Sequence, residues 1–144
     1  RLNLKTGAVV EGPLSDTITE FGVINNRVAG KKYGVTYSAI PTEGWFTFDG
    51  VIRHEVETGR EEAVRLPSGV FCSEAVFAPR IGARSEDDGY VLTYTIDVNA
   101  DKSECVIFDA QRMTEGPVAR VELPERISSG THAWWDDRSA LSLS

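Results

Sequence analysis

The sequence is poor in the residues that build cationic surfaces. Lys and Arg number 15 against 22 Asp and Glu, and Lys31-Lys32 is the only basic pair. The formal net charge of -7 and the pI of about 4.8 argue against nucleic-acid phosphates and acidic membrane surfaces as main partners, because no block of Lys or Arg offsets the acidic excess. We therefore expect no nucleic-acid partner.

Cysteine, histidine and long apolar runs are also scarce. Cys72 and Cys105 lie in strand-like apolar runs, where two buried free thiols in a reducing cytoplasm are favoured over one disulfide. No run approaches the roughly 18 apolar residues that cross a bilayer, and no basic-then-apolar leader is present, so we expect a soluble chain. The chain has the length of one domain, but it opens without Met in a strand-like pattern, which suggests a fragment of a longer polypeptide.

Helical periodicity is nearly absent, whereas short alternating runs of β-branched and aromatic residues recur between turn residues. We therefore predict an all-β chain. The clearest strand is 90–98, with Tyr and Leu on one face and mainly Val and Thr on the other. The preceding segment, 85–89 (SEDDG), lacks the alternating ligand spacing of a calcium loop, so we predict a solvated hairpin tip.

Internal repetition is the most informative feature. Residues 1–7 (RLNLKTG) align with residues 53–59 (RHEVETG), and a degenerate third copy ends at Glu115-Gly116. The pair that ends each copy is typical of a tight hairpin turn with a positive φ at Gly. The period of somewhat over ~50 residues predicts about three β-propeller blades, and a closed propeller needs at least ~4.

Each repeated hairpin is followed by a polar residue at about the same point, namely Glu20, Glu74 and His132. If these positions face the propeller axis, His132 is a candidate metal ligand, and the glutamates are candidates to hydrogen-bond such ligands from behind. The alternative is that His132 is a structural strand-end histidine and the glutamates are edge-strand charges. His54 lies inside a repeated hairpin and is interpreted as structural. No nucleophile elbow, phosphate-binding loop or HExxH helix is present, so we assign no catalytic side chain.

Several ordered segments resemble the carotenoid cleavage oxygenases, a family that includes lignostilbene dioxygenases, apocarotenoid oxygenases and the retinal pigment epithelium isomerase. Residues 19–25 (TEFGVIN) resemble its Glu-Phe-Pro-Arg-Ile-Asp segment, and 73–80 (SEAVFAPR) its Ser-Glu-Pro-Val-Phe-Val-Pro-Arg segment. Residues 86–92 (EDDGYVL) resemble its Glu-Asp-Asp-Gly turn, and 116–132 its last blade with the closing Phe-His-Gly motif. The similarity runs to about Asp136, so we expect blades over 1–136 and a tail over 137–144.

This resemblance implies a seven-bladed propeller that holds iron(II) on its axis through four histidines, with glutamates hydrogen-bonded to three of them. Carried over by position, His132 matches the last iron ligand, and Glu20 and Glu74 match two of the glutamates. Gly22 and Ala75 replace family prolines, and residues 128–131 (SSGT) are more polar than the usual aromatic segment. None of these departures removes a ligand.

The implied activity of the parent protein is cleavage of a conjugated carbon–carbon double bond by O2 into two carbonyl products, in a carotenoid, apocarotenoid or stilbene. An isomerase or hydrolase on the same iron scaffold, or a non-catalytic binding propeller, stays open. We expect a cytoplasmic protein and leave peripheral membrane contact open. The chain alone lacks three of the four implied ligands and the remaining N-terminal blades, so we expect it to be inactive by itself.

Overall fold

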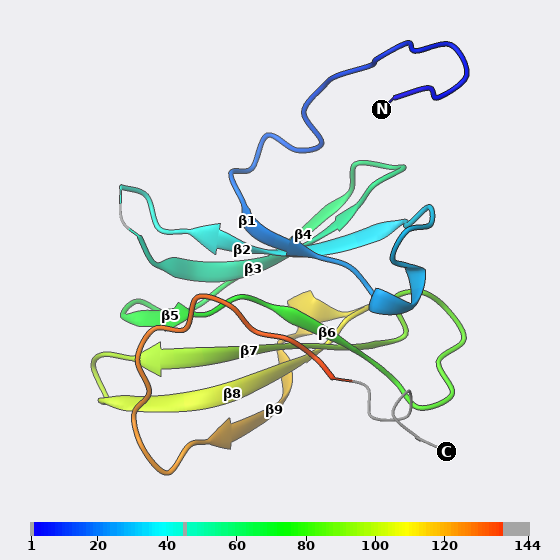
Figure 1. Cartoon of the computed structure of the whole chain (residues 1–144). Helices are drawn as coiled ribbons and strands as arrows, with labels where there is room; N and C mark the ends of the chain where they lie inside the picture. Colours follow the sequence, from blue (N-terminus) through cyan, green and yellow to red (C-terminus); the bar gives the residue numbers. More distant parts are fainter. Residues whose placement is uncertain (1, 45, 137–144) are drawn as a thin grey trace.

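The computed structural model describes residues 2–44 and 46–136 and is built almost entirely of antiparallel strands (Figure 1). The predicted tail, 137–144, lies outside the described residues. Two single-turn 3-10 helices, η1 and η2, accompany the strands. In chain order the elements are β1 (Glu20–Val23), η1 (Asn26–Val28), β2 (Val35–Pro41), β3 (Phe48–Glu55), β4 (Glu61–Arg65), β5 (Val70–Cys72), β6 (Val76–Pro79), β7 (Gly89–Asp97), β8 (Lys102–Asp109), η2 (Met113–Glu115) and β9 (Pro117–Glu122).

The strands form two antiparallel units of four, which lie one above the other in Figure 1. The first unit has the order β1-β2-β3-β4, and the second has the order β6-β7-β8-β9. The short strand β5 pairs with both β3 and β7 and so joins the units. Each unit has the strand number and pairing of a propeller blade. The segments on either side, 2–19 and 123–136, contain no strand of the sheet, and residues 2–9 form a turn closed by the isolated bridge between Leu2 and Val9.

The hydrophobic core lies between the two units. Val35, Tyr37 and Val51 of the first unit pack with apolar residues of β6, β7 and β8 in one buried cluster. The Tyr37 ring stacks on that of Phe77, with 5.5 Å between their centroids and 13° between their planes. Burial of this shared apolar face holds the blades together, because each unit alone would expose it to water.

The predicted positive φ is confirmed at all three glycines, and the tight hairpin turn is confirmed at Gly7 and Gly59, which have the same hydrogen bonds. Gly7 and Gly59 both adopt a φ of +71°, and each donates its N–H to the carbonyl four residues earlier at 2.8 Å. In both turns the Thr before the Gly accepts from the residue after it. Gly116 also has a positive φ, of 95°, but it follows η2 and bonds to the carbonyl of Met113. The third copy is therefore degenerate in conformation as well as in sequence.

Strand β7 confirms the predicted strand and shows which of its faces is buried. Val91, Thr93 and Thr95 are at most 2% exposed, whereas Tyr94 on the opposite face is 44% exposed. The threonines tolerate burial because their hydroxyls find acceptors, and Thr93 Oγ1 donates to the carbonyl of Ser73 at 3.0 Å. Cys72 and Cys105 are both free, as expected, although only Cys72 is fully buried.

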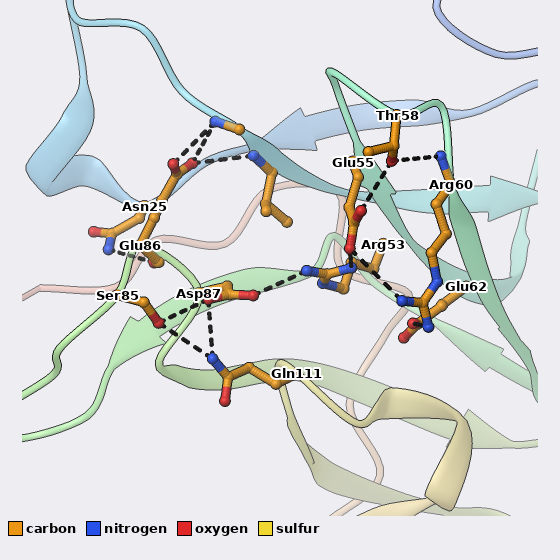
Figure 2. Close-up of polar contacts among 12 residues, drawn as sticks. Asn25, Arg53, Glu55, Thr58, Arg60, Glu62, Ser85, Glu86, Asp87 and Gln111 are labelled. Atoms are coloured by element: carbon orange, nitrogen blue, oxygen red, sulfur yellow. Dashed lines mark hydrogen bonds and ion pairs between the residues drawn. The ribbon is translucent and has the colours of Figure 1, made fainter.

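The acidic segment 85–89 is not the solvated tip that its composition predicts, because its side chains bind the other unit (Figure 2). Glu86 accepts hydrogen bonds from the N–H groups of Gly34 and Val35 at 2.9–3.1 Å. Asp87 pairs with the buried guanidinium of Arg53 at 2.9 Å. The segment therefore connects the two blades. Among the described residues, no helix has the length and apolar character that would let it span a membrane.

Candidate metal centre

Glu74 is the buried carboxylate of the candidate site. It lies between the end of β5 and the start of β6, and the residue is 9% exposed. Its Oε2 accepts the backbone N–H of Ala133 at 2.9 Å and lies 3.2 Å from Nδ1 of His132. Two donors from the C-terminal segment thus meet one carboxylate oxygen, which satisfies a buried charge.

The contact with Glu74 determines which nitrogen of His132 is free. A carboxylate offers only acceptors, so the hydrogen of a neutral imidazole must be on Nδ1. Nε2 then carries a lone pair with no hydrogen, which is the form of histidine that binds a metal ion. The His132 side chain is 73% exposed in this chain, so the lone pair is accessible. The structure therefore brings two of the three predicted site residues, Glu74 and His132, together in an arrangement that leaves Nε2 of the imidazole open to a metal ion.

Glu20, the third predicted residue, opens β1 and is exposed, and its side chain has no hydrogen bond with the described residues. Its neighbour Phe21 does reach the site: the Phe21 and His132 rings meet edge to face, with centroids 5.0 Å apart and planes 71° apart. The start of β1, the segment before β6 and the C-terminal segment therefore converge. The repeated positions predict that Glu20 itself faces this region, whereas the ring contact from β1 is made by Phe21. Whether Glu20 bonds to a ligand stays a prediction.

The described residues supply only part of the ligand set that a metal ion at His132 would need. Within 2–44 and 46–136, no three His, Cys, Asp or Glu side chains gather in a way that could hold an ion. A metal bound at His132 would need ligands from outside these residues. A cavity of about 450 Å³ adjoins the imidazole, and its lining includes the apolar side chains of Leu92, Ile127 and Trp134.

The second histidine lies in a different environment. His54 on β3 is 5% exposed, and its Nδ1 lies 3.3 Å from Oε1 of Glu61, its cross-strand partner on β4. The hydroxyl of Thr17 donates to the other oxygen of that carboxylate at 2.9 Å. These contacts, within the first unit and with the segment that precedes it, agree with the structural role expected from the sequence.

Comparison with known proteins decides the family. The family model described as "Retinal pigment epithelial membrane protein" matches residues 1–137. The chain is 38% identical over 149 residues to a carotenoid 9,10(9',10')-cleavage dioxygenase of Pisum sativum, with 94% of this chain covered. It belongs to the carotenoid cleavage oxygenase family. The chain spans only 28% of the length of that Pisum relative.

Solved structures of the carotenoid cleavage oxygenases agree. The chain superposes on a mutant of Synechocystis apocarotenoid oxygenase with a TM-score of 0.86 and 26% identity, over 94% of this chain and 29% of that one. It also superposes on the cobalt-substituted Synechocystis enzyme with a TM-score of 0.80 and 23% identity, over 90% and 28%. These apocarotenoid oxygenases are β-propellers, which confirms the predicted fold.

Sequence reasoning missed two contributors to the site. Phe21 lies in the motif that carries the family resemblance, but nothing in its residue type indicates that its ring contacts His132. The main-chain N–H of Ala133 binds Glu74 and leaves no trace in the sequence. A signal for Phe21 existed only in its position beside Glu20, at the start of a strand that follows a repeated hairpin.

Proposed function

We propose that the protein containing this chain is a non-heme iron(II) dioxygenase that cleaves a conjugated carbon–carbon double bond with O2 to give two carbonyl products. The proposed substrate class is a carotenoid, apocarotenoid or stilbene. The name of the Pisum relative, a carotenoid cleavage dioxygenase, supports the carotenoid class first. The observation that carries the proposal is the pairing of His132 with Glu74, because it presents Nε2 as a ligand.

In this proposal the residues of the chain have separate tasks. His132 contributes one of the imidazole ligands that suit iron(II), and the bound iron supplies the site at which O2 is activated. Glu74 holds the proton on Nδ1 and fixes the direction of the ring. Its charge also makes Nε2 more basic and so a better ligand for the metal ion. Glu20 is proposed to do the same for a histidine outside this chain.

The donors present suit more than one metal ion. An imidazole backed by a carboxylate is suited to divalent iron and also to cobalt or zinc, so the donor chemistry alone does not select iron. The solved Synechocystis relative is described as cobalt-substituted, which supports a centre that accepts a transition-metal ion. Iron(II) is proposed from the family resemblance together with this geometry.

The experiment is an anaerobic iron(II) titration of the full-length protein. We expect about one equivalent of iron for the wild type, loss of stoichiometric binding for His132→Ala, and binding weakened by about 10- to 100-fold for Glu74→Gln. His54→Gln is the matched control, since it changes the other histidine of this chain and should keep the stoichiometry. A well-folded wild type without stoichiometric iron would favour a non-catalytic binding propeller instead.

Turnover distinguishes the oxygenase from its alternative within the family. Labelled O2 should place one labelled oxygen atom in each of the two carbonyl products, so that both atoms of every O2 consumed are recovered, and two carbonyl compounds should appear for each substrate cleaved. A protein that binds iron and converts substrate without consuming O2 would be an isomerase or hydrolase. The isolated chain of 144 residues is proposed to be inactive, because its described residues supply a single histidine to the centre.

A further inference from the structure

Phe21 has an unusual backbone for its residue type. Its φ is +55°, a region that bulky L-residues seldom occupy, and only one other non-glycine residue of the described chain, Asp101, has a positive φ. The residue lies in a β-bulge: Glu20 pairs with Ala39 and Val23 with Tyr37, so β1 has one more residue than β2 over this stretch. Strain of this kind persists where the surrounding structure enforces it, and it often marks a functional site.

The bulge aims the Phe21 ring at His132. The imidazole and phenyl centroids are 5.0 Å apart, within the range of favourable edge-to-face pairs. Phe21 also contacts Phe48 edge to face, at 5.4 Å between centroids and 69° between planes. Phe48 is 4% exposed and belongs to the core. The ring that contacts the imidazole therefore also packs against the core.

The His132 ring can use a second contact, because the backbone hydrogen bonds that anchor its segment, such as those of Ile127 and Ala133, do not fix the ring itself. Residues 123–136 contain no strand, and a single hydrogen bond at Nδ1 leaves the ring free to pivot about that bond. A pivot would move Nε2, the atom proposed to bind the metal. The Phe21 ring occupies the space beside the imidazole and blocks this motion.

We propose that Phe21 is a positioning residue for the metal ligand His132, and that the β1 bulge exists to place its ring there. Glu74 fixes Nδ1, and Phe21 fixes the plane of the ring, so that Nε2 keeps one direction before the metal arrives. This inference rests on the proposed function. It assigns Phe21 no contact with substrate and no part in the chemistry.

The test is anaerobic binding of iron(II), and of Co(II) with its visible absorption spectrum, to the full-length protein. We expect Phe21→Leu to weaken metal binding by about 3- to 10-fold, the size of one aromatic pair, and to alter the Co(II) bands. Phe21→Tyr keeps the ring and should bind more tightly than Phe21→Leu. Phe108→Leu is the matched control, because Phe108 is a core phenylalanine of β8 with no ring contact to His132 among the described residues.

Each outcome decides between the possibilities. Wild-type affinity in Phe21→Leu, with binding abolished in His132→Ala, would overturn the positioning role and leave the proposed function standing. Equal weakening in Phe21→Leu and Phe108→Leu would also overturn it, since the effect would then be general loosening of the core. Equal weakening in Phe21→Leu and Phe21→Tyr would show that the ring is not what matters. A folded wild type that binds no metal would overturn both proposals.

Discussion

Removal of the Glu86 carboxylate should release the start of β2 from the second blade. The carboxylate accepts from two backbone N–H groups, those of Gly34 at 2.9 and 3.0 Å and of Val35 at 3.1 Å. Hydrogen bonds to a charged group contribute roughly 1.5–3 kcal/mol each. Because Gly34 is only partly buried and can find water, we expect a total of about 3 kcal/mol for Glu86→Ala.

The assay is amide hydrogen exchange of the full-length protein, followed at Gly34 and Val35. If these amides exchange through local opening, a loss of about 3 kcal/mol accelerates exchange by roughly 100-fold, since 1.36 kcal/mol is a factor of ten. Glu86→Gln keeps one carbonyl oxygen as an acceptor and should accelerate exchange by about tenfold. The bond from Asn25 to the main-chain carbonyl of residue 86 should survive both substitutions.

A matched control is Glu122→Ala on β9. Glu122 also makes a polar contact, with Lys102 at 3.3 Å, but its side chain is 67% exposed, and it is far along the chain from β2. Its loss should leave exchange at Gly34 and Val35 unchanged. Unaltered exchange at both amides in folded Glu86→Ala would refute the reasoning, because it would mean that the carboxylate does not hold this strand.

Single substitutions at Phe21, Asp87 and Cys72 test backbone strain, charge pairing and burial in turn. At the φ of +55° found at residue 21, a Cβ atom is strained against the backbone, and glycine has no Cβ. The Phe21→Gly variant should therefore be more stable than Phe21→Ala by about 1 kcal/mol in thermal unfolding, although alanine is usually preferred to glycine inside a strand. Burial alone would raise the pKa of Asp87, but hydrogen bonds from Gln111, from a serine hydroxyl and from Arg53 lower it. Because the pKa of Asp87 is lower in the folded than in the unfolded chain, its carboxylate stabilises the fold fully above the unfolded-state pKa of about 3.9, and this stability is lost as the pH falls through the folded-state pKa. The difference in melting temperature between wild type and Asp87→Asn should therefore be constant near pH 5–8 and become smaller below about pH 4. Burial raises the pKa of the Cys72 thiol to about 12, so little reactive thiolate forms at pH 8 in the native protein. Mass spectrometry should therefore find Cys72 alkylated far more slowly in the native than in the unfolded protein. Equal alkylation rates would contradict the burial of this thiol.

The repeated hairpins could be predicted from the sequence because their geometry is local. A Thr-Gly pair carries both the positive φ and the hydroxyl that caps the turn, and the turns at Gly7 and Gly59 have the same hydrogen bonds. The period of the repeat then gave the blade arrangement. Its third copy was correctly identified as degenerate, since Gly116 ends a 3-10 turn instead of a hairpin of this type.

The contacts between distant segments could not be predicted in the same way. The composition of 85–89 indicates a turn, but the partners of Glu86 lie about fifty residues earlier, and their approach depends on how two blades pack. The contact between Glu74 and His132 spans 58 residues. Repetition and family resemblance indicated that these two residues share a region. They could not indicate which oxygen of Glu74 accepts the hydrogen bond or that the N–H of Ala133 binds the same oxygen, because both depend on the path of the backbone.

The placement of His132 depends on both blades at once, and this explains why the contact between the blades matters for the site. Phe21 belongs to β1, which pairs with β2, while Glu74 lies two residues before β6 of the other unit. Glu86 binds the start of β2, and Asp87 binds Arg53 of β3, from the segment that joins β6 to β7. The two groups that hold the imidazole therefore sit on units that are tied together by buried charge as well as by the apolar core. A loosened contact at Glu86 would let Phe21 move relative to Glu74, and so would disturb the imidazole without touching it.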